Sequence, residues 1–225
     1  MLTKKRLAFS FMILCSMNLI FSQVRKIDPE TIKRTEAWEK RINEERQPPE
    51  QVMDAIGLKP GMVIGEVGVG RGRYTVHLAR RVGDTGKVFA NDIDDNALDY
   101  LRDRCRRSNI RNIEIILGEE DDPLLPEKSL DMIFMVWVFH MLEEPVPLMK
   151  NMLPSLKPGA PLVILAPPDD EIDAETREMK GKLDPDRLTI RERIEKAAAE
   201  SGFELVGMDG FLPKDTLFYL KAKTF

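Results

Sequence analysis

Short apolar runs alternate with helical patterns along most of the chain, and this alternation restricts its fold more than any other feature. Runs typical of buried strands occupy residues 62–67, 87–91, 113–117, 132–136 and 161–166. Stretches with apolar residues at three- to four-residue spacing follow most of them, as amphipathic helices require. Since parallel strands need long crossover connections, the alternation predicts a doubly wound, mostly parallel α/β sheet.

The C-terminal part of the chain departs from this pattern. Thr189 and Glu192 form a capping box that predicts the start of a helix, and Gly202 is expected to end it. Two further strand patterns follow, at residues 203–208 and 216–222, with no room for a helix between them. The final pair is therefore expected to be antiparallel, which gives seven strands with one reversed.

Length and charge narrow the class of protein. A chain of 225 residues suffices for one well-packed domain, and its net charge of −4 disfavours a general nucleic-acid binder. Cys105 falls on an apolar helical stripe and is interpreted as a core residue. A local basic run lies among acidic residues and is interpreted as a solvated helix face: Arg102, Arg104, Arg106, Arg107 and Arg111.

The first residues have the composition of an export signal. Lys4, Lys5 and Arg6 precede a mostly apolar stretch from Leu7 to Phe21, as in a secretory signal peptide. Residues 1–22 are interpreted as a signal peptide or, alternatively, a retained N-terminal anchor, and the protein as exported to an extracytoplasmic compartment. Residues 23–47 are expected to form a charged helical arm, and residues 48–225 the main domain.

A glycine-rich stretch follows the first predicted strand. Gly68, Gly70 and Gly72 stand at alternate positions, where a side chain would fill a ligand's space or prevent a tight turn. In this architecture ligands bind at the carboxyl ends of the strands. Asp92 ends the second strand, where a carboxylate can accept hydrogen bonds from two ribose hydroxyls. We therefore expect a cofactor that contains ribose.

The charges around the glycines discriminate between two cofactors. The dinucleotide pattern G-x-G-x-x-G would place a third glycine where Arg73 stands, and the acidic Glu66 would repel a pyrophosphate. A ligand with an amino group and a sulfonium is compatible with a nearby carboxylate. The charges thus favour S-adenosylmethionine over NAD.

Five segments together resemble the successive motifs of class I S-adenosylmethionine-dependent methyltransferases, and they occur in that family's order and spacing. The resemblance covers residues 48–225 and implies a Rossmann-like methyltransferase domain there. The segments are "EVGVGRG" at 66–72, "VFANDID" at 88–94, "ILGEEDDPLLP" at 116–126, "LDMIFMVWVFHML" at 130–142 and "LPSLKPGAPLVIL" at 153–165.

The resemblance also implies roles for individual residues. The Glu66–Gly72 loop, which includes Arg71, is expected to hold the methionyl part of the cofactor. Asp92 would bind the ribose, Ile93 would lie against the adenine, and either Glu119 or Glu120 would meet the adenine edge. The backbone around Met135 and Val136 would face the methionyl group. In this family the segment before the first strand often folds over the cofactor, and here the candidates are Trp38, Arg46 and Gln47.

The sequence indicates fewer candidates for residues that contact the methyl acceptor. His140 follows the fourth strand and is a candidate base or substrate contact, and Trp137 could line the acceptor pocket. Asp169 and Asp170 could face a polar or cationic acceptor, although a solvated loop is the favoured interpretation of both. No metal is expected, because methyl transfer from a sulfonium needs none and the only histidines, His77 and His140, lie far apart in sequence.

The short insert after the fifth strand favours a small-molecule acceptor over a protein or nucleic acid. Membrane contact is expected only through an uncleaved N-terminal segment, and the oligomeric state is left open. Two alternatives to an active methyltransferase remain at this stage. One is an exported binding module that keeps the fold without turnover, and the other is an NAD-type oxidoreductase.

Overall fold

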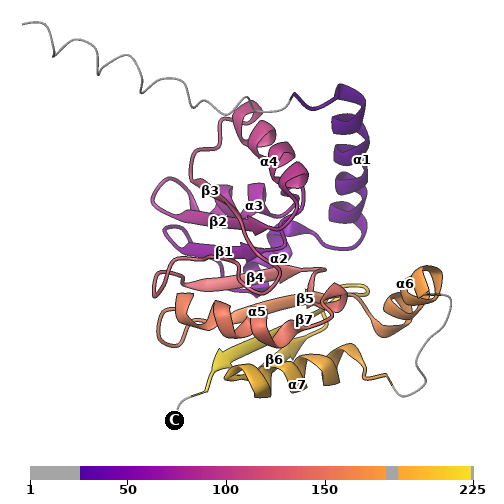
Figure 1. The fold of residues 1–225 in the computed structure, drawn as a ribbon. Helices are drawn as coiled ribbons and strands as arrows, with labels where there is room; N and C mark the ends of the chain where they lie inside the picture. The colour runs from indigo at the N-terminus through magenta and orange to yellow at the C-terminus, as the bar shows by residue number, and fades with distance from the viewer. Residues whose placement is uncertain (1–25, 181–186, 224–225) are drawn as a thin grey trace, which may run out of the picture.

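A computed structural model of the chain describes residues 26–180 and 187–223. Its centre is a seven-stranded sheet of order β3-β2-β1-β4-β5-β7-β6 (Figure 1). The strands are β1 (Val63–Val67), β2 (Lys87–Asp92), β3 (Ile113–Leu117), β4 (Met132–Val136), β5 (Leu162–Ala166), β6 (Phe203–Asp209) and β7 (Thr216–Ala222).

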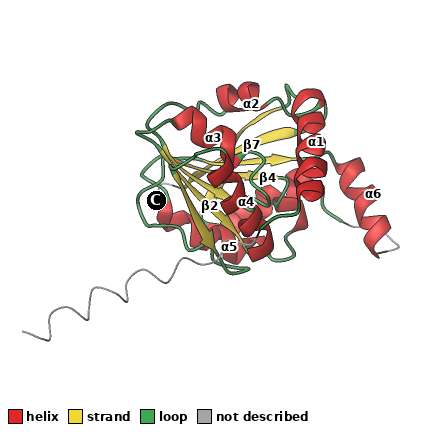
Figure 2. Ribbon diagram, turned by 90° about the horizontal axis from the view of Figure 1, so that it is seen from above, coloured by secondary structure: helices red, strands yellow, loops and turns green. Residues whose placement is uncertain are grey.

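Helices cover both faces of the sheet (Figure 2). The α-helices are α1 (Pro29–Glu45), α2 (Pro49–Ala55), α3 (Thr75–Val82), α4 (Asp95–Arg107), α5 (Pro145–Met152), α6 (Asp169–Lys180) and α7 (Ile190–Ser201). Two short 3₁₀ turns, η1 (Phe139–Met141) and η2 (Leu153–Ser155), complete the described elements.

The sheet confirms the predicted fold class. Strands β1 to β5 all run parallel to one another. Strand β7 runs antiparallel to both β5 and β6, and it lies between them. The six residues between β6 and β7 are too few for a crossover helix, which explains the reversal.

Two apolar layers hold the helices against the sheet. On one side, Leu148 of α5 and Ile194 of α7 pack with Ile133 and Ile164 of the sheet. On the other, Val52 of α2 and Leu78 of α3 pack with Phe134 and other sheet residues. Burial of both faces explains why the parallel strands are continuous apolar runs rather than alternating ones. The predicted capping box of α7 is present, with Thr189 and Glu192 exchanging hydrogen bonds.

The prediction of a solvated loop at Asp169 and Asp170 was wrong. These residues form the first turn of α6 together with Glu171. Three carboxylates are favourable at that position because a helix N-terminus carries partial positive charge. The high charge of the segment suggested a loop, but here it marks a helix that starts directly after β5.

The basic run on α4 is only partly a solvated face. Arg106 is exposed, as predicted, but Arg104 and Arg107 form ion pairs with Glu39 and Glu36 of α1. The prediction failed for these two because their partners on α1 lie 65 and 71 residues away along the chain. Cys105 is a partly buried free thiol packed against the apolar cluster of α4.

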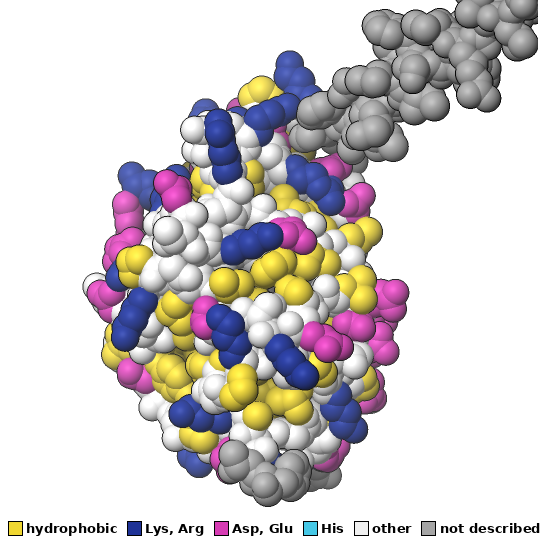
Figure 3. Space-filling model, turned by 90° about the vertical axis from the view of Figure 1, so that its left-hand side faces the viewer, with side chains coloured by type: hydrophobic (Ala, Val, Ile, Leu, Met, Phe, Trp, Pro, Cys, Tyr) yellow, Lys and Arg dark blue, Asp and Glu magenta, His cyan; other side chains and the backbone are white. Residues whose placement is uncertain are grey.

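Charges of both signs are distributed over the surface. In Figure 3, basic, acidic and hydrophobic side chains are interspersed over the face shown. Within residues 26–180 and 187–223, no helix combines the length and hydropathy needed to cross a membrane. The predicted signal peptide or anchor at residues 1–22 lies outside the described residues.

Candidate functional site

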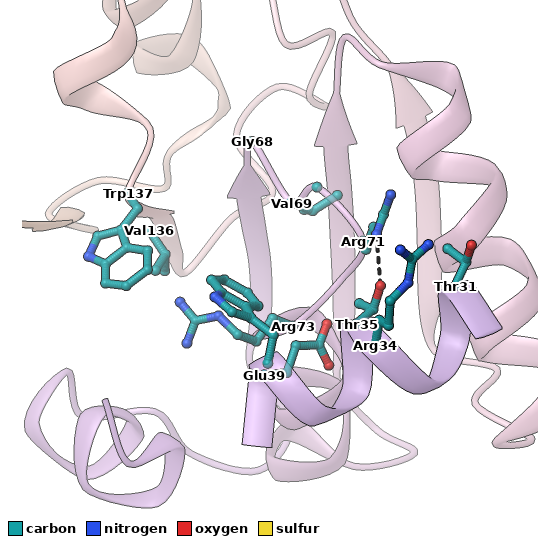
Figure 4. A pocket seen from close by; sticks show the side chains of 12 residues that line it. Thr31, Arg34, Thr35, Glu39, Gly68, Val69, Arg71, Arg73, Val136 and Trp137 are labelled. Atoms are coloured by element: carbon teal, nitrogen blue, oxygen red, sulfur yellow. Dashed lines mark hydrogen bonds between the residues drawn. The ribbon is translucent and has the colours of Figure 1, made fainter. Parts of the chain in front are cut away.

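A cavity of about 550 Å³ lies between helix α1, the glycine loop after β1 and the end of β4. Figure 4 shows its lining residues, which come from these three distant parts of the sequence. They are Thr31, Arg34, Thr35, Trp38, Glu39, Gly68, Val69, Gly70, Arg71, Arg73, Val136 and Trp137. The site is at the carboxyl ends of β1 and β4, where doubly wound sheets bind ligands.

The glycine loop is fixed by the neighbouring strand. The amides of Gly68 and Val69 both donate to the carbonyl of Asn91, at 2.9 and 3.0 Å. The amide of Gly70 donates to the Asp92 carboxylate at 2.6 Å. Asp92, predicted to bind the ribose, therefore also holds the loop in place, and each of its oxygens can accept a further hydrogen bond.

The three glycines are required for different reasons. All have positive φ, between 53° and 81°, which disfavours other residues. A Cβ on Gly68 would collide with Val138, and one on Gly72 would collide with Leu101. A Cβ on Gly70 would meet nothing within 4 Å. Of the three, Gly70 alone fits the expectation that a side chain would occupy ligand space.

Glu66 is a buried carboxylate that stands two residues before Gly68, the first glycine of this loop. It is 2% exposed, and burial raises its pKa from the ordinary 4.5 to about 7. Its Oε2 atom and the hydroxyl of the nearby Thr75 have no hydrogen-bond partner in the described part of the chain. Buried polar atoms are nearly always satisfied, so this pair is suited to accept from, or donate to, a bound molecule.

A second buried carboxylate, Asp215, is hydrogen-bonded to the cavity-lining residue Trp137. It is 1% exposed and lies between β6 and β7. It accepts two hydrogen bonds from Arg46 at 2.6 Å each and one from Gln47 at 2.9 Å. A fourth comes from the Trp137 indole at 2.9 Å. Asp215 thus joins the residues that follow α1 to the end of β4.

Sequence reasoning missed Asp215. It stands in a polar turn of ordinary composition, "LPKDT", and its three partners are distant along the chain. Arg46 and Gln47 were expected to cover the cofactor, but both side chains are engaged by this carboxylate rather than lining the cavity.

Trp137 forms one wall of the cavity in an unusual backbone conformation. Its φ is 57°, which is rare for a bulky residue and marks local strain. The guanidinium of Arg46 lies 4.5 Å from its ring centroid, and that of Arg73 lies 5.3 Å away. The ring of Trp38, from α1, is 6.5 Å away between centroids.

The middle of helix α1 is held over the cavity by contacts with α4 and the loop. Glu39 receives two hydrogen bonds from Arg104, at 2.9 and 2.8 Å. The Thr35 hydroxyl accepts a hydrogen bond from Arg71 at 2.7 Å, drawn as the dashed line in Figure 4. The charged arm predicted at 23–47 therefore forms a wall of the site.

Several predicted cofactor residues lie outside this cavity. Ile93 is 58% exposed after β2, and Glu119 and Glu120 are exposed after β3. These three remain predictions for an adenine site at the neighbouring strand ends. Met135 is fully buried in the core, so only its backbone could face a ligand, whereas Val136 lines the cavity.

His140 and Asp169, the proposed acceptor contacts, are engaged elsewhere. His140 is on η1, where its Nε2 lies 3.6 Å from Glu175 of α6. Burial lowers its pKa, and its Nδ1 has no hydrogen-bond partner among the described residues. Asp169 accepts a hydrogen bond from the Ile190 amide at 2.8 Å and pairs with Arg187. Neither side chain lines the cavity.

The described residues contain no group of three or more His, Cys, Asp or Glu that could hold a metal ion. His77, expected to be structural, lies on α3. Burial lowers the pKa of His77 to about 4, which keeps it neutral near pH 7.

The fold, the glycine loop and the cavity together define a Rossmann-like domain with a ligand site at the strand ends. A sequence profile for a "Methyltransferase domain" matches residues 64–159. A crystal structure of an S-adenosylmethionine-dependent methyltransferase from Aquifex aeolicus is similar with a TM-score of 0.68 and 26% identity. That similarity covers 87% of this chain and 98% of the other. Residues 64–159 thus match a methyltransferase domain, and the fold is similar to that of S-adenosylmethionine-dependent methyltransferases.

Other relatives extend the comparison. The ubiquinone/menaquinone biosynthesis C-methyltransferase UbiE of Salmonella arizonae is 29% identical over 114 residues. The match spans 50% of this chain and 45% of that relative. Geranyl diphosphate C-methyltransferase from Streptomyces coelicolor A3(2) has 14% identity and a TM-score of 0.65, with 88% and 86% of the two chains covered. At that identity the likeness shows the fold alone.

Proposed function

We propose that this protein is an S-adenosylmethionine-dependent methyltransferase that acts on a small molecule. The observation that carries the proposal is the cavity between the glycine loop, the end of β4 and helix α1. Its place at the strand ends is the binding position of the fold, and its lining joins the family's glycine loop to two tryptophans.

The residues present fit the cofactor. The open space above Gly70 allows a ligand to approach the loop backbone, and the Asp92 carboxylate would accept hydrogen bonds from the ribose. The unpartnered Oε2 of Glu66 would accept a hydrogen bond from, or offset the charge of, the amino group. Aromatic rings such as those of Trp38 and Trp137 also favour a nearby cation. When bound, the cofactor supplies a methyl group on a sulfonium, which is a good leaving group.

The chain's own contribution is to position the reactants and exclude water. Helix α1 and Trp137 close the cavity from two sides, and both are fixed by hydrogen bonds to Asp215 or Arg104. Such fixed walls lower the barrier by holding the reacting atoms in line. A cavity of about 550 Å³ is in the size range of small-molecule sites.

The proposal is tested by calorimetric titration of the full chain with S-adenosylmethionine, S-adenosylhomocysteine and NAD. We expect micromolar affinity for the first two and none for NAD. Asp92→Ala should weaken binding, because the ribose loses its acceptor. A folded protein that binds neither adenosyl compound would refute the proposal. Release of S-adenosylhomocysteine with an added acceptor would separate an enzyme from a binding module without turnover.

We also propose that residues 1–22 direct the domain across a membrane, as a cleaved signal or as an anchor. The support is the sequence of three basic residues followed by an apolar stretch of signal-peptide length. An exported domain would have to receive its cofactor from inside the cell. Fractionation of cells with an antibody to the domain tests this, and a purely cytoplasmic, full-length chain would overturn it.

A further inference from the structure

Arg73 is a buried guanidinium in the wall of the cavity. The residue is 9% exposed and follows the last glycine of the loop. One of its nitrogens donates to the Asn43 side chain at 3.1 Å, and another donates to the Gln47 side chain at 2.6 Å. Its guanidinium lies over the rings of Tyr74, Trp137 and Trp38, at 4.7, 5.3 and 5.9 Å from their centroids.

These contacts leave the charge of Arg73 without a direct ion pair, and Glu39 and Glu66 act on it only by charge attraction across a longer distance. Both hydrogen-bond acceptors are neutral amide oxygens, and no carboxylate of the described residues forms an ion pair with it. A guanidinium has five N–H donors, and the two hydrogen bonds to Asn43 and Gln47 use two of them. Burial lowers the pKa of Arg73, because it removes the charge from water.

Two neighbouring arginines, Arg46 and Arg104, are paired with carboxylates. Arg46 pairs with both Asp215 and Glu171, and Arg104 pairs with Glu39 through two hydrogen bonds. A buried charge without a partner costs several kcal/mol, and such sites cluster where proteins bind ligands. Unlike Arg46 and Arg104, Arg73 has no carboxylate in ion-pair contact, and it lines the cavity, where a bound ligand can supply an anionic group.

The other charges on the cavity wall act in the same direction. Arg34 and Arg71 also line the cavity, and Arg71 donates to the neutral Thr35 hydroxyl. Glu39 is the one acidic residue among the lining residues, and it is already engaged by Arg104. In Figure 4, Arg73 reaches toward Trp137, while Arg34 and Arg71 stand on the other side beside α1. The wall thus carries excess positive charge.

We propose that Arg73 binds an anionic group, a carboxylate or a phosphate, of a molecule held in this cavity. The inference rests on the proposed function, which places small molecules there. A planar guanidinium binds such groups through paired hydrogen bonds. The anion has two possible sources: the amino-acid carboxylate of the cofactor, or an acidic methyl acceptor.

The first arm of the test removes the carboxylate from the adenosyl ligand and, separately, the guanidinium of Arg73 from the protein. Dissociation constants of S-adenosylhomocysteine and its decarboxylated analogue are measured for the wild type, Arg73→Met and Arg73→Lys. If the cofactor is the source, Arg73→Met weakens S-adenosylhomocysteine by about 30-fold and the decarboxylated analogue less than about threefold. Arg73→Lys, which keeps the charge, should lose less.

The second arm addresses the acceptor. Wild type and Arg73→Met, each saturated with S-adenosylhomocysteine, are titrated with benzoate and with inorganic phosphate. Fluorescence is the readout, because Trp38 and Trp137 are the only two tryptophans and both line the cavity. If an acidic acceptor is the source, binding of one of these anions is weakened at least about tenfold in Arg73→Met while affinity for S-adenosylhomocysteine is kept.

Asn43→Ala is the matched control, because it removes one hydrogen bond from Arg73 and leaves the charge. It should change each dissociation constant by less than about threefold. A purely structural Arg73 would affect both adenosyl ligands equally and neither small anion, and that result overturns the inference. The proposed function would still stand, because wild-type affinity for S-adenosylhomocysteine measures it separately. If the wild type binds no adenosyl compound, the anion titration is made on the free protein and decides the inference alone.

Discussion

Two buried carboxylates lie behind residues that line the cavity, and their hydrogen bonding differs: Asp215 accepts a hydrogen bond from Trp137, whereas Glu66 precedes the glycine loop. Asp215 is 1% exposed and accepts four hydrogen bonds from three side chains. Glu66 is 2% exposed, and its Oε2 has no partner among the described residues. Burial raises the pKa of Glu66 to about 7, so near neutral pH it is divided between its charged and neutral forms.

The difference separates a structural carboxylate from one that is prepared for a ligand. A buried charge that is fully hydrogen-bonded fixes its neighbours, and removal of such a charge leaves them unpaired. A buried charge with unused acceptor capacity lowers stability until a cation or donor arrives. Asp215 should therefore matter most to folding, and Glu66 to binding. Four substitutions test this contrast.

The largest effect is expected for Asp215→Asn. The amide cannot pair with Arg46 and directs N–H groups at other donors, so the free energy of unfolding should fall by about 3 kcal/mol. Urea denaturation followed by far-UV circular dichroism measures it. An Asn variant as stable as the wild type would show that Asp215 does not anchor the cavity wall.

Glu66→Gln should act in the opposite direction at high pH. Because the pKa of Glu66 is higher in the folded chain (about 7) than its ordinary value of 4.5, the folded state binds more protons between these values. The free energy of unfolding therefore falls as pH rises from about 4.5 to about 7, and this contribution is constant above that range.

The substitution removes this dependence. At pH 8 Glu66→Gln should be more stable than the wild type by about 3 kcal/mol, and at pH 4 the two should be equal. It should also weaken S-adenosylhomocysteine binding at pH 8, because the amino group loses a charged partner. Denaturation at pH 4, 6 and 8 gives the comparison, and a pH-independent difference would contradict the raised pKa.

Trp137→Phe removes one donor from Asp215 and keeps an aromatic ring. Since three hydrogen bonds to the carboxylate remain, the expected loss of stability is about 1 kcal/mol. The midpoint of thermal unfolding measures it. If the loss equalled that of Asp215→Asn, the indole hydrogen bond rather than the arginine pair would be the main function of Asp215.

The smallest effect is expected where the end of α4 contacts α1. Arg107 pairs with Glu36 and Asp103, and its side chain is 34% exposed. Arg107→Gln should change stability by less than about 0.5 kcal/mol, because exposed ion pairs are screened by water and salt. Ligand affinity should be unchanged. A larger effect on affinity would mean that α1 is held over the cavity mainly from α4.

Much of the architecture could be read from local patterns. The strands, their mostly parallel arrangement and the reversed final pair follow from apolar runs and the lengths of the connections. The position of the cavity beside the glycine loop follows from the same topology. The α6 helix was missed because the high charge of its sequence was interpreted as a sign of a solvated loop. Asp215 was missed because no motif near it in the sequence indicates a buried carboxylate.

Local sequence therefore determined most of the helices and strands, with α6 as the exception, and the positions of the glycine-rich turn and the other motifs. Periodicity and turn chemistry act over a few residues, and a single chain displays them directly. The tertiary structure alone decided which charges meet. It brought Arg46 and Trp137 to Asp215, engaged His140 with Glu175, and left Arg73 and Glu66 with unused hydrogen-bonding capacity. Whether a buried charge is satisfied depends on residues far away in sequence, so it is settled only when the chain has folded.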